Sequence, residues 1–344
     1  MRGQLNEQNL ANWGGKKQPT GLMILVFLIH NQKLLVFLPP KNKGKNECLQ
    51  ISCSRSAIGR LAGEVSLESL FLGQEPEGNN AHITLDDLAF LTCRGGWPGA
   101  LDLKPKAALK IPNAYLDGVI NSDISRIDDV KRDPLFMSRI IKSLARHQGG
   151  QIPVSTIYSD LSANAPSMSI DTIENYVNVL KKIFLEEDMH AWNPNLRSKT
   201  AIRTSDTRYF VDPSIATAAL KITPTDLINN LETFGLLFET LAIRDLRVYS
   251  ELLDGKVYHY RDKNGLECDA VIHLDNGQYG LVEIKLGGDN LVEAGAKTLK
   301  QLANKIDVDK MQEPAFKMVL TGVGQYSYQR DDDVYVVPIG CLKN

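Results

Sequence analysis

Short apolar runs, some with polar residues at alternate positions, follow one another in the last third of the chain. Residues 256–261, 267–274 and 279–285 are such runs between turn signals and are predicted to be β-strands. The segments between them end in Asn264-Gly265 and Asn276-Gly277, and Asn-Gly suits the two positive-φ positions of a type I′ turn. The three strands are therefore expected to be joined as hairpins.

Helical patterns flank these strands. Residues 230–249 carry an apolar stripe, and residues 291–305 are predicted to form a second helix. The stripe of the first helix consists of Phe234, Leu237, Phe238, Leu241 and Ile243. Two more strands are expected at 316–320 and 334–338. Residues 226–344 are therefore predicted to form an α/β domain.

The middle of the chain has the pattern of a winged helix, a small helical domain followed by a two-stranded wing. The predicted elements are helices at 133–147, 156–161 and 169–185 and strands at about 189–193 and 208–211. Ser169 is a good N-cap for the third helix, with Thr172 close behind it. Residues 129–225 are predicted to form this winged-helix-like domain.

The first part of the chain is the least regular. Two apolar runs, 22–29 and 34–38, are separated by polar residues that would be costly inside a membrane, so they predict two buried strands joined by a turn. Thr84 followed by Asp87 is a variant of the capping box and predicts the start of a helix. Residues 1–128 are assigned to one region of mixed α/β or helical structure.

Composition and charge exclude a few classes of protein. The chain has 344 residues with a formal net charge of −2, which argues against a strongly basic coat for nucleic acid but leaves room for a local basic patch. Its five cysteines form no C-x-x-C pair, so reduced thiols in a cytoplasmic protein are expected. No segment resembles a signal peptide or a membrane span, and no membrane partner is expected.

Candidate chemistry lies on two of the predicted strands. Asp269 lies on the second strand, and Glu283 and Lys285 share one face of the third because they are two residues apart. These three side chains are expected to converge. Carboxylate oxygens are ligands for Mg²⁺, so Asp269 and Glu283 are candidate metal ligands, and a neighbouring lysine can orient water or stabilise charge on a phosphate.

This arrangement resembles the PD-(D/E)XK nuclease superfamily. Members have a helix that carries a glutamate, then an aspartate, and then Glu-x-Lys one strand later. Here Glu239 lies in the predicted helix 230–249, and Asp269 and Glu283-Ile284-Lys285 follow in that order. The resemblance implies catalytic roles for these four side chains and for Gln301 of the next helix. Families have kept this fold while losing the chemistry, so active and inactive forms both stay open.

A wider resemblance runs from Leu91 to Lys285. In this part the chain is similar to bacterial and archaeal AAA-type ATPases that end in a domain of unknown function with a nuclease-like fold. The matching segments are Arg94-Gly95-Gly96-Trp97-Pro98, the helix from Tyr115 to Ser125, the helix from Ser169 to Leu185, Asn195-Leu196-Arg197, Arg208-Tyr209-Phe210-Val211-Asp212-Pro213, Leu236 to Leu246, and Tyr260-Arg261 to Asp269. Their order follows that of the family, which the chain therefore resembles. The absence of the family's ATP-binding motifs makes it a truncated or degenerate member.

The chain departs from that family where ATP would bind. Members begin with G-x-x-x-x-G-K-[ST], whose backbone and lysine hold the β- and γ-phosphates, and a later strand ends in an acidic pair. Gly14-Gly15-Lys16-Lys17 lacks the first glycine and the Ser or Thr after the lysine, and neither apolar run is followed by an acidic pair. Residues 1–128 are therefore expected to be a degenerate or truncated ATPase-type region that lacks the phosphate loop, and no binding or hydrolysis of ATP is expected. Mg²⁺ is a candidate cofactor.

Nucleic-acid binding is a separate hypothesis for the winged-helix-like domain. The third helix shows Asp171, Glu174, Asn175 and Asn178 on its polar face, and the acidic residues would repel phosphates. The wing is more basic, and its candidates for contacting a DNA backbone are Arg197, Lys199, Arg203 and Arg208. Packing or protein contact by the same domain is the alternative.

Three functions therefore stay open. The first is a DNA-associated relative of the ATPase family that has lost its ATP site and carries a nuclease-like domain. The second is an active Mg²⁺-dependent DNA nuclease. The third is a protein-interaction module of the kind found in defence or toxin–antitoxin assemblies.

Overall fold

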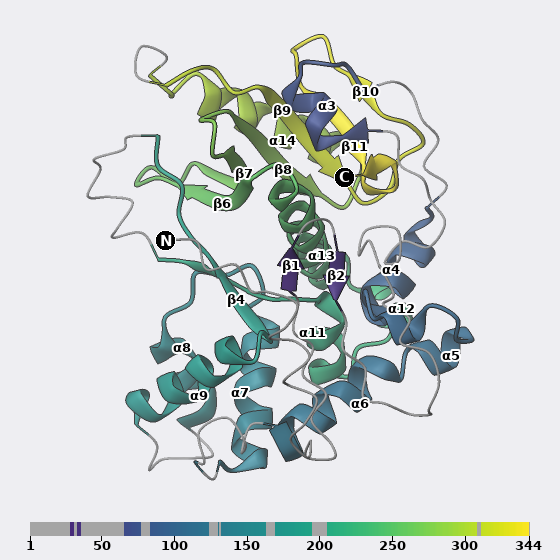
Figure 1. The fold of residues 1–344 in the computed structure, drawn as a ribbon, viewed down its shortest axis with the longest axis vertical. Coiled ribbons are helices and arrows are strands. Elements are labelled where there is room, and N and C mark those ends of the chain that lie inside the picture. The colour runs from purple at the N-terminus through teal and green to yellow at the C-terminus, as the bar shows by residue number, and fades with distance from the viewer. Residues whose placement is uncertain are drawn as a thin grey trace, which may run out of the picture.

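The computed structural model describes residues 28–30, 33–35, 65–76, 83–123, 130, 132–162, 169–194, 205–307 and 311–343. The fold is a mixed α/β structure, which confirms the predicted class. A six-stranded sheet lies at one end, and helices make up most of the other end (Figure 1). The long helix α13 (Leu231–Glu251) lies between these two parts.

The sheet has the strand order β10-β11-β9-β8-β7-β6. Its strands are β6 (Gly255–Arg261), β7 (Glu267–Leu274), β8 (Tyr279–Lys285), β9 (Phe316–Thr321), β10 (Tyr328–Gln329) and β11 (Tyr335–Pro338). Strands β6, β7 and β8 are antiparallel neighbours, whereas β9 is parallel to β8, and β11 is parallel to β9. The predicted strands are confirmed, and the short edge strand β10 was not predicted.

The two hairpin turns differ from the predicted type. A type I′ turn needs positive φ at both central residues. Gly265 and Gly277 have φ of 82° and 91°, but neither preceding asparagine has positive φ. The glycine amides donate to Asp262 O and Leu274 O, at 3.2 and 2.9 Å, as in a turn closed by a left-handed glycine. The hairpins are confirmed, and the type I′ assignment is wrong.

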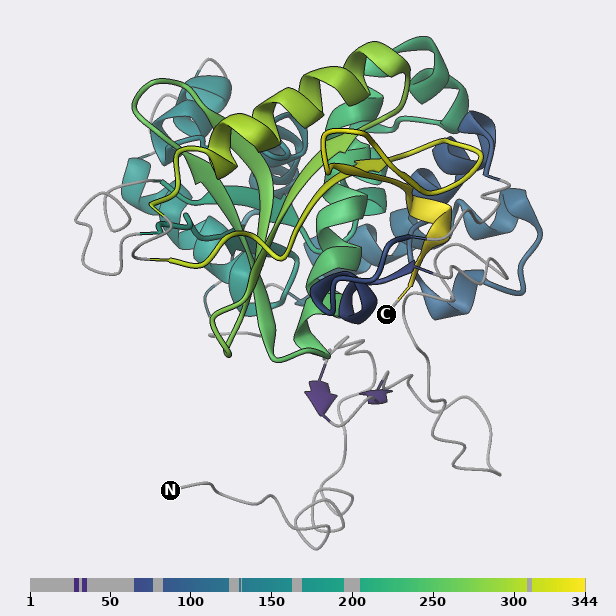
Figure 2. The same cartoon turned by 90° about the horizontal axis from the view of Figure 1, so that it is seen from above.

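Two helices cover opposite faces of the sheet. Helix α13 packs on the face that includes Ile272 and Ile284, in the main hydrophobic core. Helix α14 (Asp289–Ala303) packs on the other face, against Val271 and Leu281, in a second core. Figure 2 shows α14 running along the outer side of the sheet. Because strand residues alternate between faces, Asp269, Glu283 and Lys285 belong to the α14 side.

The middle of the chain forms three helices and a hairpin. They are α7 (Pro134–Arg146), α8 (Val154–Ser162), α9 (Ile170–Lys182), β4 (Glu186–Met189) and β5 (Thr207–Phe210). The three helices are confirmed, and Ser169 caps α9 by accepting from Thr172 N at 3.1 Å. Strand β4 begins three residues before its predicted start. Its first three residues are acidic and do not look like a strand in the sequence, but Glu186 is buried in an ion pair with Arg208.

The hairpin is packed inside the molecule. Tyr209 and Phe210 are each 1% exposed and belong to the main core. After β4, Ala191 forms a bridge with His259 of β6 at the edge of the sheet. The predicted wing therefore joins the middle of the chain to the C-terminal sheet, at least in its described residues.

A second helical group includes α11 (Pro213–Leu220), which packs against α4 (Leu85–Arg94) and α6 (Ile111–Gly118). It also comprises α5 (Pro105–Ala108), α12 (Pro224–Asn229), the π-helical turn Val119–Asp123 and the 3-10 turn Pro98–Ala100. The predicted cap of α4 is confirmed, because Thr84 and Asp87 form a capping box. Helix α4 packs on α11 and α12, across the boundary predicted between residues 128 and 129.

Two short pairs complete the described structure. Strand β3 (Val65–Ser66) pairs with β12 (Leu342–Lys343), which follows the 3-10 turn Ile339–Cys341, and β3 leads into α3 (Leu67–Phe71). Strands β1 (Leu28–His30) and β2 (Lys33–Leu35) are antiparallel, as expected for two strands joined by a turn. Within the described residues, no helix is long and apolar enough to cross a membrane.

Candidate functional site

The candidate site begins where β7 and β8 separate. Their ladder runs from His273 opposite Tyr279 to Ala270 opposite Val282. Beyond the last pair of this ladder, the backbone amide of Ile284 donates a hydrogen bond to a side chain of β7: Asp269 Oδ2 accepts it at 2.7 Å. This bond fixes the carboxylate in the gap between the two strands.

Lys285 joins the two strand carboxylates. Its Nζ lies 2.9 Å from Asp269 Oδ2 and 2.6 Å from Glu283 Oε2. Glu283 is only 4% exposed, whereas the side chains of Asp269 and Lys285 are 21% and 23% exposed. The convergence predicted from strand alternation is confirmed, and its outer part reaches solvent.

Burial and charge perturb this cluster. Burial, followed by the charge of Asp269, raises the pKa of Glu283 to about 8, although Lys285 opposes the rise. Burial alone would lower the pKa of Lys285, but the two carboxylates outweigh it and raise that pKa above its ordinary value. At neutral pH the lysine is therefore charged, and the Glu283 carboxyl group holds a proton much of the time.

Glu239 approaches the cluster from α13. Burial and then the Asp269 charge raise its pKa to about 8, so the two carboxyl groups are close enough to repel each other. Its Oε1 accepts a hydrogen bond from the hydroxyl of Tyr209 at 2.6 Å. The charge of Lys285 also acts on Glu239. Glu239 thus belongs to the same electrostatic unit while being held by the middle of the chain.

Two cavities meet at Lys285. One, of about 670 Å³, is lined by Asp262, Asn264, Gly265, Leu266, Glu267, Asp269, Glu283, Lys285, Thr298, Gln301 and Lys305. Gln301 therefore faces the cavity that Asp269, Glu283 and Lys285 also line. The other cavity, of about 400 Å³, has mostly apolar walls and includes both Glu239 and Lys285. A substrate at Lys285 would have room on either side.

The donor set bears on the expected Mg²⁺. Among the described residues, no group of three or more His, Cys, Asp or Glu side chains is arranged to hold a metal ion. Mg²⁺ is commonly bound by one or two carboxylates together with waters and substrate phosphates, so Asp269 and Glu283 fit it as a two-carboxylate site. In this structure Lys285 Nζ lies between the two carboxylates. It would have to move before a single Mg²⁺ ion could contact both Asp269 and Glu283.

The predicted DNA-binding residues fall into two groups. Arg197, Lys199 and Arg203 lie outside the described residues. Arg208 donates to Glu186 Oε1 at 3.1 Å and to Ile152 O at 3.2 Å, and its side chain is 16% exposed. The guanidinium is thus largely enclosed and already paired, a placement that does not present it to a phosphate backbone.

Sequence reasoning missed the role of Tyr209 at this site. In the sequence, Tyr209 belongs to one of the segments that resemble the ATPase family and to a predicted strand of the wing. Strand periodicity puts Tyr209 on the face opposite Arg208, but no local signal indicates that this face meets α13. Lys305 was also missed, although it lines the larger cavity and pairs with Asp262.

Comparison with known families divides the chain into two matched parts. Residues 85–226 match a domain of unknown function, DUF8612, and residues 234–342 match another, DUF4143. The second is a domain found in AAA-ATPase-associated proteins. No curated protein and no solved structure matches the chain. The junction between the two matches lies at the start of α13, and the first match runs across the predicted boundary at residue 128.

Proposed function

We propose that the C-terminal part of the chain is a nuclease-type site that hydrolyses phosphodiester bonds in DNA with the help of Mg²⁺. The observation that carries the proposal is the contact of Lys285 Nζ with both Asp269 and Glu283 at the edge of a large open cavity. These residues stand in the order and on the elements of a PD-(D/E)XK nuclease, which Glu239 of α13 completes.

Energetics support a functional role for this cluster. Buried ion pairs contribute little to the stability of a fold, and replacing them with well-packed apolar residues of similar volume often leaves the unfolding free energy unchanged or raises it. Strongly perturbed carboxyl groups that line a cavity are, by contrast, typical of functional sites. Glu239 and Glu283, each with a pKa raised to about 8, meet that description.

Each residue has a role in the proposed chemistry. Asp269 and Glu283 would hold Mg²⁺, which supplies positive charge for the phosphate oxygens. Lys285 would orient the attacking water or stabilise the charge on the phosphate, and ionised Glu239 would accept a proton from water. Gln301 would position the backbone of the substrate inside the cavity.

The origin of the chain is part of the same proposal. A nuclease-like unit preceded by a winged-helix-like unit fits a relative of AAA-type ATPases that lacks the phosphate loop. The match of residues 234–342 to a domain found in AAA-ATPase-associated proteins supports this assignment. ATP binding is not expected, and Gly14-Gly15-Lys16-Lys17 lies outside the described residues.

A protein-interaction role is the second candidate, and it concerns the middle of the chain. Its hairpin is packed against α13 with Arg208 enclosed, and Asp171 and Glu174 of α9 are exposed. An acidic helix face repels phosphates and suits a basic protein surface. This favours packing or protein contact over DNA binding for the described part of that domain.

The test is cleavage of DNA by the purified full chain with Mg²⁺ or Mn²⁺, together with calorimetric titration of Mn²⁺. Asp269→Asn and Lys285→Met are expected to lower the rate by roughly 10²-fold or more, as is usual for loss of an electrostatic group at the reacting centre. Lys300→Met is the control, since Lys300 forms a comparable pair with Asp332 outside the cavity. If the wild-type chain does not cleave DNA, the proposal is wrong, whether or not the chain binds Mn²⁺.

A further inference from the structure

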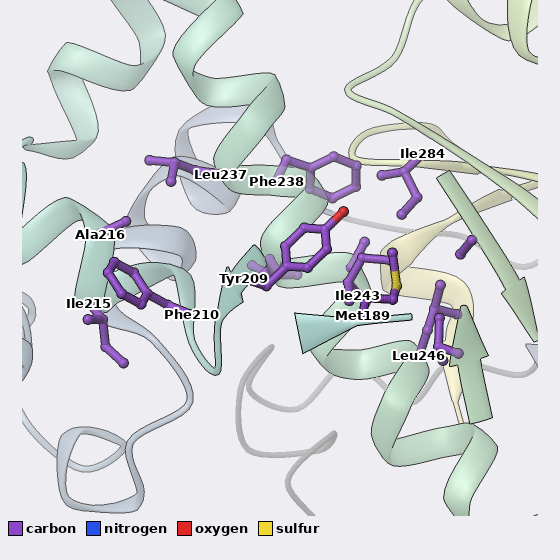
Figure 3. Close-up of a cluster of buried hydrophobic side chains, with 14 of the residues drawn as sticks. Met189, Tyr209, Phe210, Ile215, Ala216, Leu237, Phe238, Ile243, Leu246 and Ile284 are labelled. Atoms are coloured by element: carbon purple, nitrogen blue, oxygen red, sulfur yellow. The ribbon is translucent and has the colours of Figure 1, made fainter. Parts of the chain in front are cut away.

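The hydroxyl of Tyr209 connects the middle of the chain with the candidate site. Tyr209 lies on β5 and is 1% exposed, and it donates to Glu239 Oε1 across the junction with α13 at 2.6 Å. Figure 3 shows its ring beside α13, with the hydroxyl directed away from β5 toward the side where Phe238 and Ile284 lie. Ile284 is the residue between Glu283 and Lys285.

Further contacts hold this arrangement in place. Gly149, with φ of +72°, approaches Glu239 so closely that an added Cβ would lie 2.9 Å from its Oε1. The guanidinium of Arg247 lies 5.7 Å from the centre of the Tyr209 ring and also pairs with Glu187 of β4 at 3.2 Å. The middle of the chain therefore encloses the Glu239 carboxyl group from two sides.

We propose that Tyr209 is a positioning residue for the nuclease-type reaction, which it serves by holding the Glu239 carboxyl group in place and by favouring its ionised form. The inference rests on the proposed function. It makes the site a composite of the segment matched at residues 85–226 and the segment matched at 234–342. The middle of the chain then has a part in catalysis without touching the substrate.

A purely structural role for this hydroxyl would not need a carboxylate. A buried tyrosine hydroxyl requires a partner, and a backbone carbonyl is sufficient, as when Tyr279 donates to Gln312 O at 2.7 Å. Burial and the charge of Asp269 favour the protonated form of Glu239, whereas the hydrogen bond from Tyr209 favours the ionised form. Loss of that bond alone would raise the Glu239 pKa further above its ordinary value.

The first experiment needs neither metal nor DNA. The carboxyl carbon of Glu239 is titrated by NMR in the full wild-type chain, in Tyr209→Phe and in the control Tyr279→Phe, which also loses a buried hydroxyl with a short bond. Tyr209→Phe is expected to raise the Glu239 pKa by about one unit, and the control to leave it unchanged. If Tyr209→Phe leaves the Glu239 pKa unchanged, or if Tyr279→Phe moves it as much, the inference is overturned.

The second experiment follows the rate of Mg²⁺-dependent cleavage from pH 6 to pH 9.5. Tyr209→Phe should lose roughly tenfold in kcat near pH 7 with little change in KM, and should recover most of the loss at high pH, where Glu239 ionises again. A loss at all pH values, or one matched by Tyr279→Phe, would overturn the positioning role. If the wild-type chain does not cleave DNA, the proposed function fails by itself, and the NMR titration still decides whether Tyr209 controls the ionisation of Glu239.

Discussion

The carboxyl groups around Lys285 outnumber its single positive charge. Asp269, Glu283 and Glu239 all act on one another electrostatically, and burial makes any uncompensated charge costly. The cluster therefore reaches neutrality by keeping protons that free glutamic acid would lose near pH 4.3, or by binding a cation. The same residues that make the site responsive to a metal ion also make the fold sensitive to pH.

Lys285→Met tests this balance at the residue scale. The Glu283 pKa is raised in the folded state, to about 8, so its stabilising effect is complete below its unfolded pKa and is lost as pH rises through about 8. Lys285 lowers the Glu283 pKa, so its removal raises that pKa further. At pH 6 Glu283 is protonated with or without the lysine, whereas at pH 9 the variant must either ionise this buried group without its partner or keep it protonated at a pH where the unfolded chain is ionised. We expect a loss of about 3 kcal/mol in unfolding free energy at pH 9 and nearer to about 1 kcal/mol at pH 6.

Urea unfolding at the two pH values measures the difference. Lys300→Met provides the comparison, because the Lys300 side chain is 38% exposed and its pair with Asp332 should contribute less than about 1 kcal/mol at either pH. An equal loss for Lys285→Met at pH 6 and pH 9 would show that Glu283 does not titrate in this range.

At the scale of elements, one carboxylate joins α11, the segment after α4, and α13. Asp212 is the N-cap of α11, and its Oδ1 accepts from Ser214 N at 2.9 Å. Its Oδ2 accepts from Gly96 N, after α4, at 2.9 Å and from Arg244 of α13 at 2.7 Å. The segments Arg94-Gly95-Gly96-Trp97-Pro98 and Asp212-Pro213, found as family motifs in the sequence, therefore meet in space for a structural reason.

Asp212→Ala should destabilise the fold strongly. It removes a helix cap and takes one of two carboxylates from the buried Arg244, which keeps its contact with Asp245, so we expect a loss of about 4 kcal/mol. Thermal or urea unfolding measures it. Asp226→Ala is the matched control, because Asp226 completes the capping box of α12 at an exposed position and its loss should be far smaller. Similar losses for the two variants would argue against Asp212 as the joint.

Elements were predictable where local signals agree. The limits of β7 and β8 follow from apolar runs between turn signals, and the cap of α4 follows from Thr84 and Asp87. Strand β4 was misplaced because Glu186 and Asp188 look like surface residues, and only the partner Arg208 explains why Glu186 is buried. Alternation also predicted the convergence of Asp269, Glu283 and Lys285, since it needs only two neighbouring strands.

The rest of the site required tertiary structure. The contact between Tyr209 and Glu239 depends on how a hairpin in one matched segment packs on a helix in the next, and residue spacing carries no information about that packing. Arg208 was predicted to contact phosphate for the same reason, because its pairing with Glu186 is also a tertiary contact. A basic residue in a sequence shows its charge but not the carboxylate that neutralises it.

At the scale of the whole molecule, residues 65–71 and the C-terminal residues, far apart in the sequence, lie together beside the sheet. Strand β3 pairs with β12, and Phe71 of α3 packs edge-on against Phe316 with ring centres 5.0 Å apart. Val65 and Leu342 are 2% and 4% exposed. Residues 65–71 therefore pack with the C-terminal sheet, although the sequence predicts that they belong to the N-terminal region, residues 1–128.

Leu342→Ala tests this connection between distant segments. The lost side chain leaves a cavity beneath β3, which for a buried leucine costs about 2–5 kcal/mol where it cannot be filled. Because β3 and α3 are short and are followed by a turn at residues 72–73, we expect them to open locally before the sheet unfolds. Hydrogen exchange followed by mass spectrometry should show faster exchange in residues 66–71, with β7, β8 and β9 unchanged. Lys343→Ala, at an exposed neighbouring position, should leave both regions protected. Faster exchange throughout the sheet in Leu342→Ala would instead show that the β3–β12 pair is part of a single cooperative unit with the candidate site.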